Sequence, residues 1–340
     1  MRTFLVAAAT CFPLLLALGA CSDNTDPSAS ASSSSGRSGS SGSSSGDGVD
    51  GSSGSSGASS SSGSSSGSGP RSTYPCEPGR SEKPIRIVAG NISNGNAQTY
   101  DDGTGLRIFK ALTADIALVQ EMNYGNDGEE AMRSFVDAGF GAEYSWFRGN
   151  GTSIPNGIVS RYPIVDTGQA DDPDSSNTRT FVWARIDVPG DHDVLAVSVH
   201  LSTDAPKRRP QVETLLGMID GVVRDGDLLV LGGDFNTDSR DATGVPALAV
   251  RFEVNGPYPA DGEGNPNTNA SRGKPYDWVV ADSELEARSI QTTLGERTYE
   301  HGLVFDARID VDRSQVQGVQ ASDSDGHQHM AVLRTFAVCE

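Results

Sequence analysis

The stretch LVLGGDFNTDSR, residues 229–240, is the most informative part of this chain. Apolar residues and two glycines lead directly into Asp234, Phe235 and Asn236. A short apolar run that stops at turn residues predicts a buried strand, which here ends at Asp234. Gly, Asp and Asn are ordinary turn residues, so the stretch is either a plain turn or the edge of a functional site. The ends of the other predicted strands decide between the two.

Those other strands also begin or end with residues that bind metals or transfer protons. They are the apolar segments at 85–93, 115–122, 193–202, 276–282 and 329–338. If the sheets align these ends, the polar side chains converge on one cleft, which a plain turn does not explain. The residues concerned are Asn91, Glu121, His200, Asp234, Asn236, Asp277 and His329.

The chemistry of these side chains indicates Mg²⁺. This ion prefers oxygen ligands, is held by one or two carboxylates, and keeps several waters for a substrate phosphate. Zinc sites are typically built with Cys ligands or with the H-E-x-x-H spacing, and these histidines show neither pattern. We therefore expect Mg²⁺ as the cofactor, with Mn²⁺ as an alternative.

The order of the predicted elements indicates an α/β fold. Helical spacing occurs at 106–113, 129–140 and 208–223, and two strands around a PGDHD turn read as a hairpin. Many strands with few helices between them favour a four-layer α/β/β/α sandwich of two mostly antiparallel sheets, with helices outside. A doubly wound parallel sheet is the alternative, but it needs a helix after nearly every strand.

The first twenty residues are typical of an export signal. Arg2 precedes an apolar run from Phe4 to Ala20, which Thr10 and Pro13 interrupt, and the run ends at Cys21. This is too short and broken for a membrane-spanning helix. The LGAC sequence resembles a bacterial lipobox, which implies cleavage before Cys21 and lipid attachment to it. Plain secretion is the alternative. Ser22 in place of Asp favours the outer membrane, on either its periplasmic or its cell-surface face.

A tether follows at 21–75. Between residues 28 and 69 the chain has 24 Ser and 11 Gly in 42 residues, which cannot bury enough apolar surface to fold. Such a coil has a root-mean-square span of roughly 35 Å. No second linker appears in the remaining residues, so we expect one domain at 76–340.

The four cysteines divide between these segments. Cys11 leaves with the signal and Cys21 takes the lipid, so Cys76 and Cys339 remain at the two ends of the domain. An even pair in an exported protein predicts a disulfide, which the loop-entropy model credits with at most about 5 kcal/mol. The first and last strands then lie close together. Two free thiols are the alternative.

Net charge excludes binding to nucleic acid through bulk charge. The chain carries −19, and residues 1–70 contain four acids and two bases, which leaves −17 for the rest. Non-specific nucleic-acid binders are usually basic, because phosphate contacts supply most of their affinity. An acidic balance is compatible with a site that gathers a divalent cation.

Seven short motifs follow one another along the chain: GNIS, DIALVQE, NGIVSRYPI, VSVHLS, GGDFN, YDWVV and HMAVLRTF. In this order they resemble the endonuclease/exonuclease/phosphatase superfamily. The superfamily includes deoxyribonuclease I, abasic-site endonucleases, bacterial sphingomyelinases and inositol-polyphosphate phosphatases. The resemblance covers residues 84–340 and implies the deoxyribonuclease I-like sandwich expected above.

The resemblance also implies a catalytic role for several residues. Asp234 and Asn236 would flank the scissile phosphate, with Asp234 orienting or deprotonating the attacking water. His329 would transfer a proton or donate to the phosphate, and Asp277 would fix its tautomer. His200 would donate from the opposite side.

Phosphate and metal binding are implied as well. Glu121 would hold Mg²⁺, Asn91 would bind metal water or phosphate, and Arg179 would touch the phosphate or support the site. Each position has a structural alternative, such as a turn cap for Asn91. The three basic residues at 207–209 precede a helix and are either phosphate contacts or, more simply, a solvated turn.

The chain departs from the family pattern near its end. The family usually ends in Ser-Asp-His-x-Pro-Val, whereas this chain reads SDSDGHQHMAV, which puts Gln328 in the place of the metal-binding Asp. Asp325 or Asp323 supplies the missing carboxylate, or the metal site is weaker. His327 is the alternative to His329 for proton transfer.

We therefore expect a lipid-tethered, monomeric, Mg²⁺-dependent phosphodiester hydrolase, with a nuclease slightly ahead of a sphingomyelinase-like phospholipase or a phosphomonoesterase. A phospholipase needs an exposed apolar hairpin, for which the polar loop around Tyr258 is the only candidate. Its partners would be the phosphodiester substrate and, through Cys21, the membrane. A non-catalytic surface binding module on the same fold is the second alternative.

Overall fold

A computed structural model describes residues 76–173 and 179–340. The expected signal peptide, the tether and Cys21 lie outside the described residues. No helix of the described part of the chain is long and apolar enough to cross a membrane.

The larger sheet contains seven strands in the order β10-β14-β1-β2-β4-β3, with β13 also paired to β14. Only β1 and β2 pair in parallel, and the other neighbours are antiparallel. The strands are β1 (Glu82–Gly90), β2 (Ile116–Val119), β3 (Ser145–Arg148), β4 (Gly157–Ser160), β10 (Ser289–Ile290), β13 (Leu303–Phe305) and β14 (Ala331–Cys339).

The smaller sheet contains five strands in sequence order, β5-β6-β7-β8-β9. Strands β6 and β7 form the predicted hairpin, and only β7 and β8 are parallel. A separate hairpin joins β11 (Thr292–Leu294) to β12 (Arg297–Tyr299). The five strands are β5 (Ile164–Asp171), β6 (Thr180–Ile186), β7 (Val194–His200), β8 (Leu228–Asp234) and β9 (Asp277–Ala281).

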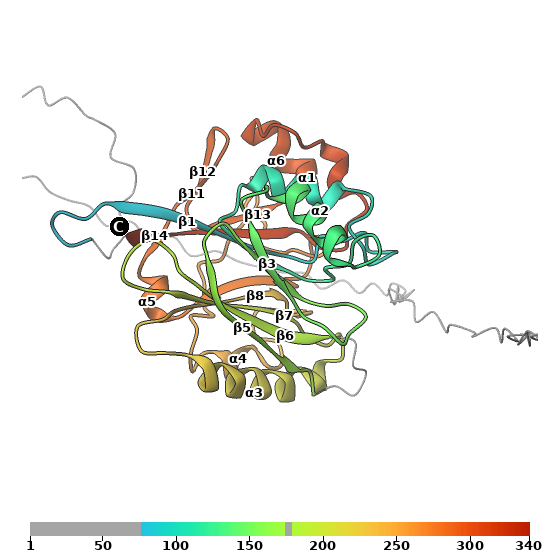
Figure 1. Ribbon diagram of the computed structural model, residues 1–340. Helices are drawn as coiled ribbons and strands as arrows, with labels where there is room; N and C mark the ends of the chain where they lie inside the picture. The colour runs from blue at the N-terminus through green and yellow to red at the C-terminus, as the bar shows by residue number, and fades with distance from the viewer. Residues whose placement is uncertain (1–75, 174–178) are drawn as a thin grey trace, which may run out of the picture. The chain divides into compact units, whose positions relative to one another are not determined.

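Helices cover the outer faces of both sheets (Figure 1). The seven-stranded sheet carries α1 (Thr104–Leu112), α2 (Glu129–Gly139) and α6 (Ala307–Ser314), and the five-stranded sheet carries α3 (Ala205–Val222) and α4 (Val245–Leu248). Short helices α5 (Ser283–Glu286) and η1 (Ala321–Ser324) complete the set. The four-layer sandwich of mostly antiparallel sheets is confirmed, and the doubly wound alternative is wrong.

Strand β8 shows why the opening stretch is apolar on both faces. Leu228 and Val230 pack between the two sheets, whereas Leu229 and Leu231 pack against the layer of α3. Towards the end of the strand, Gly232 lets the sheets approach, since a Cβ there would lie 2.8 Å from Leu118 Cδ1. The glycines therefore bring the larger sheet close to the strand end that carries Asp234.

The two ends of the described chain are joined. Cys76 and Cys339 form a disulfide across a sequence separation of 263 residues. Strand β1 pairs along its length with β14, with Glu82 opposite Cys339. The first and last strands are therefore neighbours, as the cysteine positions predict.

Candidate active site

Strand register brings the predicted polar residues to one end of the sandwich. In the five-stranded sheet, His200 at the end of β7 lies opposite Asp234 on β8, which in turn lies opposite Asp277 on β9. In the seven-stranded sheet, Asn91 directly follows β1, and Glu121 lies two residues beyond the end of β2. His329 lies two residues before β14.

Asp234 is the centre of this arrangement. Its Oδ2 lies 3.0 Å from His200 Nε2 and 3.5 Å from His329 Nε2. The same oxygen accepts from Asn91 Nδ2 at 3.3 Å and from Asn236 Nδ2 at 3.2 Å, while Oδ1 accepts from the Asn236 amide at 2.8 Å. Burial works to raise the pKa of Asp234, but the charges of His329 and His200 outweigh it and lower that pKa. Asp234 is therefore an ionised acceptor.

His329 lies between two carboxylates. Its Nδ1 is 3.0 Å from Asp277 Oδ2, and its Nε2 faces Asp234. Burial opposes protonation, but the charges of Asp277 and Asp234 dominate and raise the pKa of His329 to about 10. The protonated form of His329 is thus favoured, with Nδ1 hydrogen-bonded to Asp277 and Nε2 paired electrostatically with Asp234.

Glu121 forms a different part of the site. It is only 6% exposed and adopts a left-handed backbone conformation, with φ of 51°. Its carboxylate accepts from Ser93 Oγ at 2.6 Å, Asn91 Nδ2 at 3.1 Å and Gln98 Nε2 at 3.4 Å. No Lys, Arg or His within the described ranges forms an ion pair with it. A buried carboxylate whose partners are all neutral fits a divalent cation, because it lacks a counter-charge.

A second group of possible metal ligands lies at Asp234, Asp277 and His329, whose ligand atoms are within 4.8 Å of one another. In this cluster the His329 ring is hydrogen-bonded to Asp277 and lies 3.5 Å from Asp234, so it balances part of the charge of the two acids. Two groups at this edge could therefore hold a metal ion: Glu121 with Asn91, and the Asp234 cluster.

The carbonyl of Leu201, just after His200, joins two more predicted residues. It accepts from Arg179 Nη1 at 3.0 Å and from Asn236 Nδ2 at 2.9 Å. The charge of Arg179 also contributes to the lowered pKa of Asp234. Arg179 therefore lies within electrostatic range of the site and helps to hold the loop after β7.

Sequence reasoning missed supporting residues on α3. Arg208 is buried and donates to the Asn236 carbonyl, and Gln211 accepts from the Ser202 amide at 2.8 Å. For Arg208 the expected solvated turn is wrong, because its side chain packs beneath the loops that carry the site. The signal was available, since Arg208 and Gln211 lie four residues before Val212 and Leu215, on the same helix face.

Three candidates from the segment 323–327 lie elsewhere. The structure does not bring Asp325 into the site: its side chain is exposed directly after η1. Asp323 is bonded to Arg107 and caps η1, which fixes this turn. His327 contacts Thr104 Oγ1 at 2.8 Å, and burial lowers its pKa to about 4. Gln328, in the place of the family acid, packs over Gly95.

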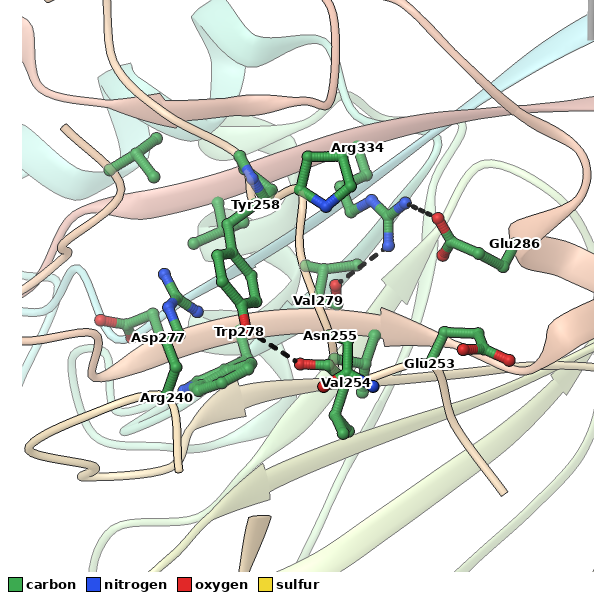
Figure 2. Close-up of a pocket in the computed structure, with 15 residues that line it drawn as sticks. Arg240, Glu253, Val254, Asn255, Tyr258, Asp277, Trp278, Val279, Glu286 and Arg334 are labelled. Atoms are coloured by element: carbon green, nitrogen blue, oxygen red, sulfur yellow. Dashed lines mark hydrogen bonds and ion pairs between the residues drawn. The ribbon is translucent and has the colours of Figure 1, made fainter. Parts of the chain in front are cut away.

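A small cavity lies beside Asp277, at the edge of β9 (Figure 2). Its volume is about 30 Å³, which is water-sized. Arg240 lies over the rings of Tyr258 and Trp278, at 4.3 and 4.2 Å from their centroids. Burial lowers the pKa of Arg240 to about 10. This stack packs the loop after β8 against β9.

Comparisons with known proteins agree with this fold. A crystal structure of a conserved protein of unknown function from Enterococcus faecalis V583 superposes with a TM-score of 0.52 and 10% identity, covering 75% of this chain and all of that one. An endonuclease/exonuclease/phosphatase from Bacteroides vulgatus gives a TM-score of 0.52 and 14% identity, covering 76% of this chain and all of that one. No curated protein sequence matches the chain.

The family model described as "Endonuclease/Exonuclease/phosphatase family" matches residues 77–323. That range contains β1 to β13. Within the described residues, the predicted site residues that lie outside it are Cys76, Asp325, His329 and Cys339. The chain therefore belongs to the endonuclease/exonuclease/phosphatase family and is a metal-dependent phosphoric ester hydrolase.

Proposed function

We propose that this chain is a Mg²⁺-dependent phosphodiesterase that cleaves nucleic acid, and that a lipid on Cys21 tethers it outside the inner membrane. The observation that carries the proposal is the contrast around Asn91, whose amide donates to both Glu121 and Asp234. On one side lies a buried carboxylate whose hydrogen-bond partners are all neutral, and on the other an acid paired with two histidines.

The residues of the chain divide the work of phosphodiester hydrolysis. When bound at Glu121 and Asn91, Mg²⁺ supplies Lewis-acid polarisation and charge neutralisation at the phosphate. Asp234, kept ionised, accepts a hydrogen bond from the attacking water and orients it. Asn236 and Asn91 hold Asp234 in place and present amide groups at the same edge.

His329 and His200 act on the phosphate itself. His329, kept protonated by Asp277, is suited to donate to an oxygen as negative charge develops on it. His200 lies on the other side of Asp234, with Nε2 3.0 Å from the carboxylate, and its buried Nδ1 has no hydrogen-bond partner. These positions suit one donor on each side of the attacked phosphorus.

Nucleic acid is favoured over a lipid surface by the outside of the domain. Among the described residues, the large exposed hydrophobic side chains are Val165 and Val250, and the β11–β12 hairpin exposes none. Tyr258, the one sequence candidate for lipid docking, is held against Trp278 and Arg240 (Figure 2). The apolar surface that interfacial binding requires is therefore missing from these residues.

The proposal is tested on the exported chain with its disulfide intact, by nicking of supercoiled plasmid in Mg²⁺ and in EDTA. We expect Mg²⁺-dependent nicking in the wild type and none in Asp234→Ala or His329→Ala, with Arg297→Ala as a surface control. Failure of the folded, Mg²⁺-binding wild type to nick DNA or RNA would exclude the nuclease. Hydrolysis of phosphomonoesters or sphingomyelin in its place would then identify the alternative.

The tether is tested separately in cells that incorporate labelled palmitate. We expect label in the wild type and none in Cys21→Ala, together with loss of the wild-type protein from the soluble fraction. A wild-type protein that is exported unlabelled would mean plain secretion.

A further inference from the structure

The loop at residues 261–274, DGEGNPNTNASRGK, touches both segments that carry the Asp277–His329 pair. Thr268 Oγ1 accepts from the Asp277 amide at 2.7 Å, and the Thr268 carbonyl accepts from the Met330 amide at 2.7 Å. Asn269 forms a β-bridge with His329 itself. Thr268 and Asn269 therefore lie between the start of β9 and the segment that leads into β14, and set the spacing between them.

This loop has almost no apolar side chains with which to hold its shape. Pro266 and Ala270 are its only apolar residues apart from glycine, and it contains no helix or strand. A segment of this composition does not keep one conformation by hydrophobic packing. Its order must come from polar contacts.

Arg272 supplies the contacts that join several parts of the loop to one another and to Asp306. Its guanidinium donates to the carbonyls of Asn267 at 2.8 Å and Asn265 at 3.3 Å, and it pairs with Asp261 Oδ2 and Asp306 Oδ2, each at 2.8 Å. We call these four acceptors the Arg272 cage. The side chain is only 11% exposed, so the interactions are weakly screened.

The Arg272 cage has the ligand composition of a cation site, and the guanidinium of Arg272 occupies it. Two carboxylates and two carbonyls are the ligand types that hold hard cations in proteins. Asp310 adds a third acid, which accepts from the Gly262 amide at 2.9 Å, and burial together with the charge of Asp261 raises the pKa of Asp310 to about 6. Arg308 also pairs with Asp306 and lies 3.9 Å from Met330 Sδ, but among the described residues it makes no hydrogen bond or ion pair with the loop.

We propose that Arg272 is a positioning residue for His329: through the Arg272 cage it fixes Thr268 and Asn269, and these fix the Asp277–His329 pair. The proposal rests on the hydrolytic function proposed above. Geometry supports this role, because Arg272 contacts all four acceptors of the cage and Thr268 bonds to both segments that carry the Asp277–His329 pair.

The test compares Arg272→Ala with Arg308→Ala in the exported chain. Both variants remove an arginine from Asp306, but only Arg272→Ala empties the cage. Since a misplacement of about 1 Å can cost about 100-fold in rate, we expect kcat for plasmid nicking to fall by about that factor in Arg272→Ala, with KM and Mg²⁺ affinity little changed. Arg308→Ala is expected to keep wild-type kcat.

Two further measurements separate positioning from general stability. Millimolar guanidinium is expected to restore kcat in Arg272→Ala by refilling the cage, and to have no such effect on the wild type. The downfield proton resonance of His329 Nδ1, bonded to Asp277, is expected to shift or broaden in Arg272→Ala and to return with guanidinium. If that variant does not fold, Thr268→Val removes the hydroxyl that binds the Asp277 amide without changing any charge, and a lower kcat is expected.

Three results would overturn the proposal: wild-type kcat in folded Arg272→Ala, an equal loss in Arg308→Ala, or no restoration by guanidinium. An unchanged kcat in Thr268→Val would also overturn the proposal. If the wild type hydrolyses no phosphodiester at all, the proposed function fails instead, and the His329 resonance still decides whether Arg272 positions the ring.

Discussion

The two sides of the site differ in how their charges are balanced. Around Glu121 the partners are a hydroxyl and two amides, whereas around Asp234 two histidines and an arginine supply positive charge. The seven-stranded sheet thus contributes an acid whose hydrogen-bond partners are neutral, and the five-stranded sheet contributes an acid that is paired with histidines. The difference shows that two buried acids near strand ends can have opposite electrostatic surroundings, according to the partners that their folds supply.

The largest effect is expected from Asp234→Asn, which removes the shared acceptor from the paired side. General acid–base groups contribute about 10²–10⁴-fold, so we expect kcat for plasmid nicking to fall by about 1,000-fold. Mg²⁺ affinity, measured by calorimetry, should change little. Loss of Mg²⁺ binding in this variant would mean that the two sides are a single metal site.

Glu121→Gln removes the negative charge from the Glu121 side of the site. The partners of metal ligands alone account for about 10–100-fold in metal affinity, so loss of the ligand itself should weaken Mg²⁺ binding by at least about 100-fold. Activity should return in part at high Mg²⁺ concentration, because the residues around Asp234 are intact. Wild-type Mg²⁺ affinity in Glu121→Gln would move the metal site to the Asp234 cluster.

The charge on His329 predicts a pH dependence of stability in EDTA. The folded pKa of about 10 lies above the ordinary value of 6.5, so the stabilisation is complete below pH 6.5 and is lost as the pH rises through 10. We expect the free energy of unfolding in urea to fall over this window in the wild type more steeply than in His329→Asn. Parallel curves for the two proteins would show that His329 is neutral in the folded state.

The smallest effect is expected from Asp325→Asn. An exposed side chain outside the site should change stability by less than about 0.5 kcal/mol. Mg²⁺ affinity and kcat should stay within about twofold of the wild type. A large loss of Mg²⁺ affinity would instead show that Asp325 moves to the metal when it binds.

The sequence predicted what depends on periodicity and strand ends. Apolar runs bounded by polar residues located Asn91, Asp234 and Asp277, because parallel or antiparallel pairing brings such ends to one edge. The two end cysteines predicted that β1 and β14 are neighbours, since a disulfide requires proximity.

The sequence could not predict contacts made by polar residues far apart in the chain. In the Arg272 cage, Arg272 pairs with Asp306, which lies 34 positions further along the chain. Neither segment shows an apolar periodicity that would predict this contact. Asp325 was predicted as a metal ligand because it is close to His329 along the chain, but it follows η1 and its side chain is exposed to solvent. Ser93 lies within the GNIS motif, but its role was not predicted, because nothing in its spacing indicates that its hydroxyl binds Glu121.

The disulfide also determines how the domain bears load. A chain held by its N-terminal segment is pulled at Cys76, and there the force passes directly to Cys339 on β14 and into the hydrogen bonds that β14 shares with β1. The nine residues of β1 span roughly 30 Å before the chain reaches Asn91. A pull on the N-terminal segment would therefore enter at the end of the sandwich opposite the predicted catalytic residues and would leave their alignment unchanged.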